Sequence, residues 1–82
     1  MLNSSNNHYP YDASDLQTQI EYNGDNLPLY IGRARPQIST NKPEWQIKKM
    51  TYDGNGNLLT VRFAGGNNEY NYSWDERTSY TY

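Results

Sequence analysis

The strongest constraint on the fold is a hairpin pattern in the second half of the chain. Residues 45–58 read WQIKKMTYDGNGNL, a strand-forming run that enters an Asn-Gly turn, and residues 58–63 then alternate apolar and polar side chains. Period-two alternation on both sides of an Asn-Gly pair is typical of a β-hairpin. The predicted turn consists of Asp53, Gly54, Asn55, Gly56 and Asn57.

The turn type sets the register of this hairpin. A type I′ turn at Asn55-Gly56 places Tyr52 opposite Leu59 and Met50 opposite Val61. These pairs give one continuous apolar face across the two strands.

On this register, Trp45 and Ile47 fall on the other face of the hairpin. Either both faces are covered, or a β-bulge at Lys48-Lys49 switches the phase of the strand. We favour the bulge, because it brings Ile47 beside Phe63 and turns both lysines outward.

A first strand of the same module is predicted from residue 27 to about residue 35, where Leu27, Leu29 and Ile31 alternate with other side chains. Pro28 places the start of this strand at a sheet edge, because proline has no N–H to donate. Tyr70, Tyr72 and Trp74 recur with period two and predict a short strand with an aromatic face. Asp75-Glu76-Arg77 is expected to form one helical turn or a polar corner.

Domain organisation follows from composition. Residues 1–26 contain Asn-, Ser- and Gln-rich runs with scattered apolar side chains, which predicts an extended polar N-terminal arm. Residues 27–82 form the folded part. The expected fold class is all-β, a small β-sandwich or barrel-like module of about four or five short strands around the central Asn-Gly hairpin.

The chain has little material for an independent core. It has 82 residues, a third of them apolar, and no cysteine for a disulfide. Small domains of this kind usually need a disulfide, a metal or an oligomeric partner. A protein partner or self-association is therefore the expected support.

Charge and hydropathy exclude several classes of function. The net charge of −2 is too acidic for nucleic-acid binding, although residues 33–62 carry six of the seven basic side chains. No apolar run is long enough to cross a bilayer, and the amino terminus MLNSSNNHYP lacks the features of a secretory signal. We expect neither a nucleic-acid partner nor a membrane.

No catalytic, metal or cofactor site is predicted. The Asp53 turn matches the start of a calcium loop, but Leu58 occupies the glycine position and Ala64 the bidentate glutamate position. An Asx-stabilised hairpin turn explains the run better. His8 is the single histidine and has no serine or cysteine constellation to serve. The chain is expected not to be an enzyme.

Aromatic residues are the remaining candidates for function. Nine tyrosines and two tryptophans suit protein interfaces, although about half are expected to pack in the core. The alternative is a carbohydrate- or receptor-binding platform formed by Tyr70, Tyr72 and Trp74. The predicted interface residues are Tyr9, Tyr11, Tyr22, Tyr30, Trp45, Tyr70, Tyr72, Trp74, Tyr80 and Tyr82.

Two resemblances bear on function. The run YDGNGNL at residues 52–58 resembles one tyrosine-aspartate repeat of the Rhs type, but such arrays need many copies and the chain has one. An inhibitor or toxin-associated fragment is a third possibility, which rests on this single hairpin alone. Residues 30–82 carry YIGRARP, WQIKKMTYDGNGN, an Ala-x-Gly-Asn segment and WDERTSYTY. This order of blocks resembles small proteins encoded among the structural genes of tailed bacteriophages.

The phage resemblance implies a virion component, made in the host bacterial cytoplasm, in the capsid, neck or tail. As a decoration or accessory protein it would bind other virion proteins in symmetric copies, with its arm lying along a neighbouring subunit.

Overall fold

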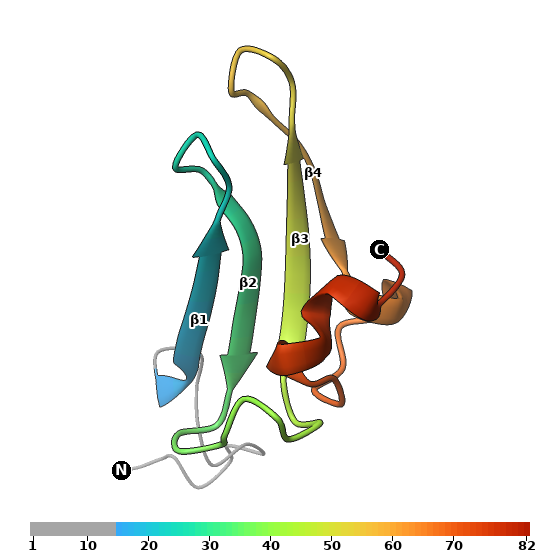
Figure 1. Cartoon of the computed structure of the whole chain (residues 1–82). Helices are drawn as coiled ribbons and strands as arrows, with labels where there is room; N and C mark the ends of the chain where they lie inside the picture. Colours follow the sequence, from blue (N-terminus) through green and yellow to red (C-terminus); the bar gives the residue numbers. More distant parts are fainter. Residues whose placement is uncertain (1–14) are drawn as a thin grey trace, which may run out of the picture.

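A computed structural model of the chain describes residues 15–82, which form one antiparallel sheet with the strand order β1-β2-β3-β4 (Figure 1). Two short 3-10 helices follow the last strand. The elements are β1 (Gln17–Tyr22), β2 (Pro28–Ala34), β3 (Gln46–Tyr52), β4 (Leu58–Phe63), η2 (Ala64–Gly66) and η3 (Trp74–Ser79).

The predicted all-β class is confirmed, with a four-stranded open sheet and little helix. The finer prediction of a sandwich or barrel is not confirmed, because β1 and β4 remain separate edges and the sheet does not close. Among residues 15–82, none of the helices has the length and apolar character needed to cross a membrane.

The expected boundary between arm and module does not match the sheet. Residues 17–22 fall within the predicted arm, yet they form β1 and pair with β2 along its length, with Gln17 opposite Ala34 and Ile20 opposite Ile31. An edge strand tolerates this polar composition, because much of its surface faces solvent. Residues 1–14 of the predicted arm lie outside the described residues.

The predicted first strand is confirmed as β2, but its place in the sheet differs. We expected Pro28 to mark a sheet edge, whereas β2 lies between β1 and β3. Pro28 is the first residue of β2, a position where the missing N–H is tolerated in an inner strand.

The central turn has the predicted residues but a different geometry. Only Gly56 has a positive φ, of 84°, and its amide donates to the Asp53 carbonyl, so the turn is not type I′ at Asn55-Gly56. The Asp53 carboxylate accepts bonds of 2.9 Å from the amides of Asn55 and Asn57. The predicted Asx stabilisation of the turn is therefore confirmed.

The register of the hairpin is partly as predicted. Met50 lies opposite Val61, but a shift between Thr51 and Tyr52 places Tyr52 opposite Leu58 instead of Leu59. The loop between β3 and β4 contains residues 53–57 and is longer than the two-residue type I′ loop that we predicted, which accounts for the one-residue displacement.

The predicted bulge at Lys48-Lys49 is wrong. Both lysines pair in register with β4, Lys48 with Phe63 and Lys49 with Arg62. Strict alternation is kept through this part of β3, so the two lysines lie on opposite faces.

The β1–β2 turn is stabilised in the same way as the β3–β4 turn, by an Asx side chain that accepts bonds from two backbone amides. The Asn23 side chain accepts bonds from the amides of Asp25 and Leu27 at 2.8 and 3.1 Å, and Asn26 takes the positive φ of 63°. Both turns lie at the same end of the sheet (Figure 1). The described chain is thus two similar hairpins placed side by side.

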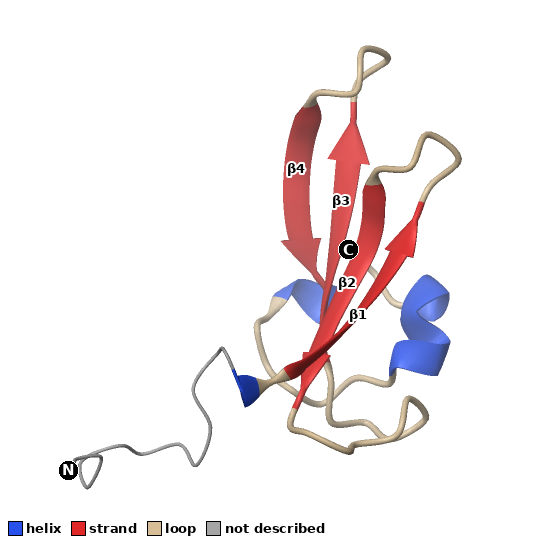
Figure 2. Cartoon of the chain, turned by 90° about the vertical axis from the view of Figure 1, so that its left-hand side faces the viewer, coloured by secondary structure: helices blue, strands red, loops and turns tan. Residues whose placement is uncertain are grey.

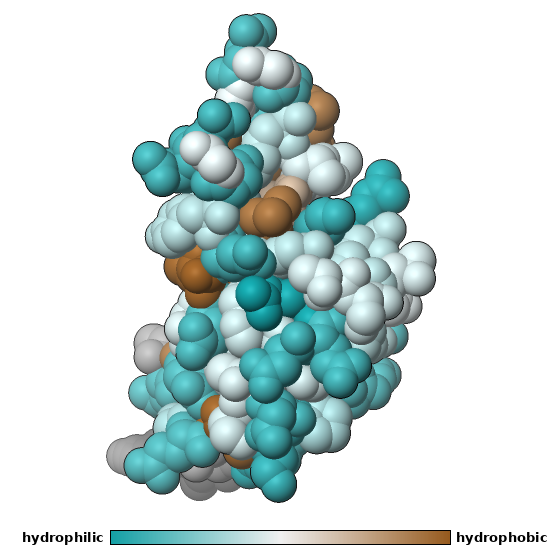
Figure 3. All heavy atoms as spheres, in the orientation of Figure 1, coloured by the Kyte–Doolittle hydropathy of each residue, from teal (hydrophilic) through white to brown (hydrophobic). Residues whose placement is uncertain are grey.

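One face of the sheet, here the aromatic face, is covered by residues 70–82, the C-terminal segment. The cluster of buried side chains on this face consists of Tyr30, Ala34, Trp45, Ile47, Ala64 and Trp74. Figure 2 shows η3 on one side of the strands. The outer surface on this side is largely hydrophilic, with scattered apolar spots (Figure 3).

Trp74 and Trp45 form the centre of this core, with ring centroids 6.3 Å apart. Gly32 makes the close approach of Trp74 possible, because a Cβ at this position would lie 2.5 Å from Trp74 Cε3. The predicted strand at residues 70–74 is reduced to one β-bridge between Trp45 and Tyr72, whereas the helical turn at Asp75-Glu76-Arg77 is confirmed within η3.

Gly32→Ala is expected to lower the free energy of unfolding by about 1–3 kcal/mol, because the methyl group would displace the Trp74 ring from the sheet. Denaturant unfolding followed by tryptophan fluorescence measures the loss. Gly54→Ala is the matched control, since nothing lies within 4 Å of a Cβ there. Equal stabilities of the two variants would contradict the role of Gly32.

Hydrogen bonds from the Asn57 backbone and side chain lower the pKa of Asp53 below its usual value. The carboxylate therefore stabilises the folded turn above pH of about 4, and this contribution is lost as the pH falls through the lowered pKa. Protection of the Asn55 and Asn57 amides, which is the ratio of the intrinsic to the measured hydrogen-exchange rate at each pH, is expected to fall over this acidic window.

Asp53→Ala should show the lower protection of both amides already at neutral pH, and this protection should not fall further in acid. Asp25→Ala, the same substitution in the other hairpin loop, is the control. Unchanged protection of both amides in Asp53→Ala would show that the carboxylate does not hold the turn.

Candidate protein-docking face

Most of the predicted interface aromatics belong to the core. Tyr30, Trp45 and Trp74 are buried, with no exposed area at Trp45, and this inaccessibility contradicts the expectation that the tryptophans dock on a partner. Tyr72, Tyr80 and Tyr82 pack against the same cluster.

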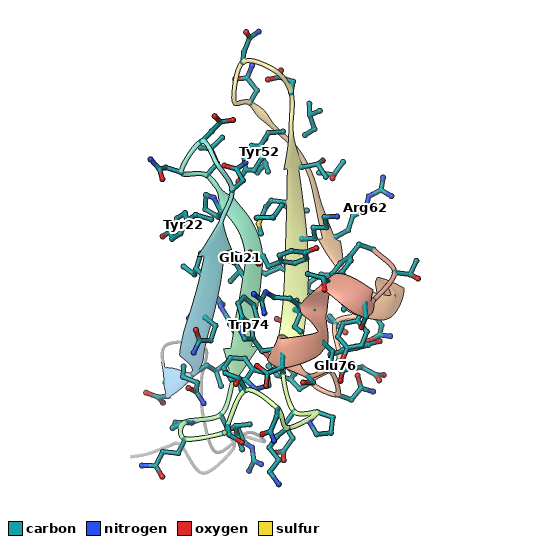
Figure 4. All side chains as sticks on the ribbon, viewed as in Figure 1. Glu21, Tyr22, Tyr52, Arg62, Trp74 and Glu76 are labelled. Atoms are coloured by element: carbon teal, nitrogen blue, oxygen red, sulfur yellow. The ribbon has the colours of Figure 1, made fainter. Side chains whose placement is uncertain are left out.

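Two of the predicted aromatics are exposed. Tyr22 is 55% exposed and projects from β1 away from the sheet, and Tyr70 is 44% exposed (Figure 4). Tyr9 and Tyr11 lie outside the described residues. The exposed aromatics therefore come from opposite ends of the described chain and form no common platform.

Hydrogen bonds tie the C-terminal segment to the sheet and to itself. Backbone bonds of 2.8 and 3.1 Å join Trp45 and Tyr72 in both directions. The Ser73 amide donates to the Tyr80 hydroxyl at 2.8 Å. The Tyr82 hydroxyl donates to the Arg77 carbonyl at 2.7 Å, and burial raises the pKa of Tyr82, so this hydroxyl stays protonated. These aromatics stabilise the fold.

An ion pair adds a contact between the two ends of the described chain. Arg77 Nε donates to the Glu21 carboxylate at 2.9 Å, while its guanidinium lies 4.5 Å from the centroid of the Trp74 ring. Glu21 and Trp74 lie on the same side of the sheet (Figure 4). β1 is thereby attached to η3 as well as to β2.

The opposite side of the sheet, here the open face, is the candidate functional site. Its central row runs across all four strands through directly paired residues, Ile20, Ile31, Lys48 and Phe63. By strand alternation Arg33, Met50, Leu59 and Val61 lie on the same face. The C-terminal segment covers the other side.

Apolar side chains of the open face are accessible at both sheet edges. Ile20 on β1 is 42% exposed, and on β4 Val61 is 46% and Leu59 61% exposed. Met50 is buried, yet it does not belong to the aromatic cluster. Single exposed apolar residues are ordinary, but several on one sheet face that nothing else in residues 15–82 covers make this face a candidate docking surface.

Two positive charges sit within this apolar surface. Partial burial lowers the pKa of Lys48, and the nearby positive charge of Arg33 lowers it further. Arg33 Nε is buried without a hydrogen-bond partner. No strand residue on the open face is Asp or Glu. Neither cation pairs with a carboxylate within residues 15–82, and the contact of Lys48 is with a ring, since its Nζ lies 5.9 Å from the centroid of Phe63. Partly buried cations are usually paired with an acid.

Residues 15–82 contain no group of His, Cys, Asp and Glu side chains arranged to hold a metal ion. Comparison with protein-family models, curated proteins and solved structures finds no match to the chain.

The open face does not follow from the sequence when residues 17–22 are assigned to the arm, because the sheet then lacks β1. A signal was present in the similar runs YNGDNL at residues 22–27 and YDGNGNL at residues 52–58. Both begin with Tyr-Asx-Gly-Asx, and the second is the predicted hairpin turn. Applying the same turn chemistry to the first run predicts β1 and hence a four-stranded sheet.

Lys48→Met is expected to raise the free energy of unfolding by a few tenths to about 1 kcal/mol, because it removes a partly buried charge and its repulsion with Arg33. Since the folded-state pKa is lowered, this penalty is present at neutral pH and is relieved as the pH rises through the lowered pKa toward 10.5. Stability measured from pH 7 to 10.5 should rise for the unmodified chain relative to Lys48→Met.

Lys42→Met provides the control, because Lys42 is an exposed lysine in the loop between β2 and β3. If Lys48→Met is no more stable than Lys42→Met at pH 7, the charge on the open face carries no penalty.

Proposed function

We propose that the chain is a non-enzymatic structural component of a tailed-phage virion, which binds other virion proteins through the open face. The observation that carries this proposal is an apolar surface that no other part of residues 15–82 covers, with two cations that pair with no carboxylate there. A sheet with one packed and one accessible apolar face gains stability when a second layer covers it.

The chemistry of the open face defines the partner. Ile20, Val61 and Phe63 require apolar side chains opposite them, and Arg33 and Lys48 require carboxylates between those side chains. A partner segment that alternates apolar and acidic residues meets both needs. Charge complementarity of this kind also sets the register of the contact.

The same face disfavours direct self-packing. Two copies placed face to face would bring the cations Arg33 and Lys48 of each copy onto a surface without carboxylates. Repetition in the particle would then come from the symmetry of the proteins that the chain decorates, in the capsid, neck or tail. Mass action in such a lattice supports a small domain that lacks disulfides.

The carbohydrate-binding alternative loses its platform. It requires Tyr70, Tyr72 and Trp74 to present their rings together, but Trp74 is buried and Tyr72 packs against the core. Tyr70 remains as a single exposed ring. We therefore favour protein docking over carbohydrate binding.

The proposal predicts that the chain is present in purified virions of the phage that encodes it, at a fixed ratio to the major structural proteins in quantitative mass spectrometry. Val61→Glu, on the open face, should lower incorporation at least about tenfold, because it places an acid where apolar contact is needed and buries it. The circular dichroism spectrum of Val61→Glu should match that of the unmodified chain, which would show that the sheet is intact.

Leu58→Glu is the matched control, since Leu58 is exposed to a similar degree, 54%, on the same strand but points to the opposite side. This variant should be incorporated normally. Absence of the unmodified chain from virions would refute the proposed function. Equal incorporation of both variants would refute the open face as the docking surface.

A further inference from the structure

A hollow on the aromatic side of the sheet, beyond the part covered by η3, is separate from the open face. Its volume is about 250 Å³, and it is lined by Lys49, Thr51, Thr60, Arg62 and Tyr82. Four of these residues form two directly opposed pairs on β3 and β4, Lys49 with Arg62 and Thr51 with Thr60. Arg62 extends from β4 into solvent (Figure 4).

The opposed cations are unfavourable for the sheet by themselves. Like charges at directly paired positions of antiparallel strands repel each other, since their Cβ atoms are about 5 Å apart. The ion pairs within residues 15–82 are Arg35 with Glu44 and Arg77 with Glu21, so neither cation of the hollow is paired there. Glu21, the acid in the same row of the sheet, is bound to Arg77.

One of the two cations is held in place by aromatic rings. Lys49 Nζ lies 5.7 Å from the centroid of the Tyr30 ring and 5.8 Å from that of Tyr82. Such contacts fix the ammonium group while leaving its N–H donors available. The positive charge is therefore already positioned at the wall of the hollow.

The hydroxyl pair adds a neutral donor. Thr51 Oγ1 and Thr60 Oγ1 are 2.6 Å apart, so one hydroxyl donates to the other. Two hydroxyls carry two protons, and this bond uses one of them, which leaves one O–H free to donate. Because the Tyr82 hydroxyl already donates to Arg77, the hollow presents ammonium, guanidinium and hydroxyl donors without an acidic acceptor.

We propose that this hollow binds a small ligand through an oxyanion, either a carboxylate or a phosphate group. A deprotonated oxyanion offers only acceptors, which matches a site that offers only donors at its charged end. Bound between Lys49 and Arg62, it removes their repulsion, and the threonine hydroxyl fixes its orientation. The Tyr82 ring provides an apolar wall for the body of the ligand.

The test is an NMR titration of the full-length chain with inorganic phosphate, acetate, glucuronate and neutral glucose, at constant ionic strength in chloride. Phosphate, or one or both carboxylates, should give saturable shifts of the Thr51 and Thr60 amides, with a Kd on the order of millimolar for an open, solvated site. Glucose should give none. A response to phosphate alone or to carboxylates alone identifies which oxyanion the site prefers.

Lys49→Gln and Arg62→Gln should each weaken binding at least about tenfold, because each removes a charge-assisted hydrogen bond. Lys42→Gln makes the same charge change in the exposed β2–β3 loop and should bind as the unmodified chain does. Circular dichroism confirms that each variant is folded, and Thr51→Val tests the hydroxyl donor independently of charge.

Three results would overturn the proposal. The first is the absence of saturable shifts with every small oxyanion, including the case in which only an acidic peptide binds. The second is an equal loss of affinity in Lys42→Gln, which would indicate a response to overall charge. The third is unchanged binding in both Lys49→Gln and Arg62→Gln.

Discussion

The packing of Trp74 on the backbone of Gly32 is the contact on which the rest of the described structure depends. It brings the C-terminal segment onto the sheet, places Trp74 beside Trp45 and positions Arg77 to bind Glu21 on the edge strand. A core this small has few other large side chains to replace it. A residue without a side chain, in the middle of an inner strand, is therefore what allows the aromatic face to be filled.

The two faces of the sheet differ in how far the described chain covers them. Residues 70–82 cover the aromatic face, whereas the open face has no cover among residues 15–82. Two adjacent lysines on β3 point to these different faces. Lys48 lies on the open face, among apolar side chains and near Arg33. Lys49 lies on the aromatic face, against tyrosine rings and opposite Arg62. The proposed protein contact and the proposed oxyanion site thus use opposite sides of one strand.

Local chemistry made part of this fold predictable. The Asp53 turn, the pairing of Met50 with Val61 and the strand now seen as β2 all follow from period-two alternation and turn residues. The role of the C-terminal tyrosines and tryptophan did not follow, because period two at residues 70–74 has the same appearance in a strand as in a segment that packs its alternate rings into a core. Exposure of the open face depends on how four strands assemble, which no single segment encodes.

The division between local hairpins and a distant covering segment has a consequence for the order of folding. Each hairpin closes across a short turn, so β1–β2 and β3–β4 pairing require little loop closure. The core instead joins Gly32 and Trp45 to Trp74, far along the chain, and must close much longer loops. Backbone pairing is thus expected to precede tryptophan burial, which makes fluorescence a reporter of the last structural event and amide protection in the turns a reporter of the first.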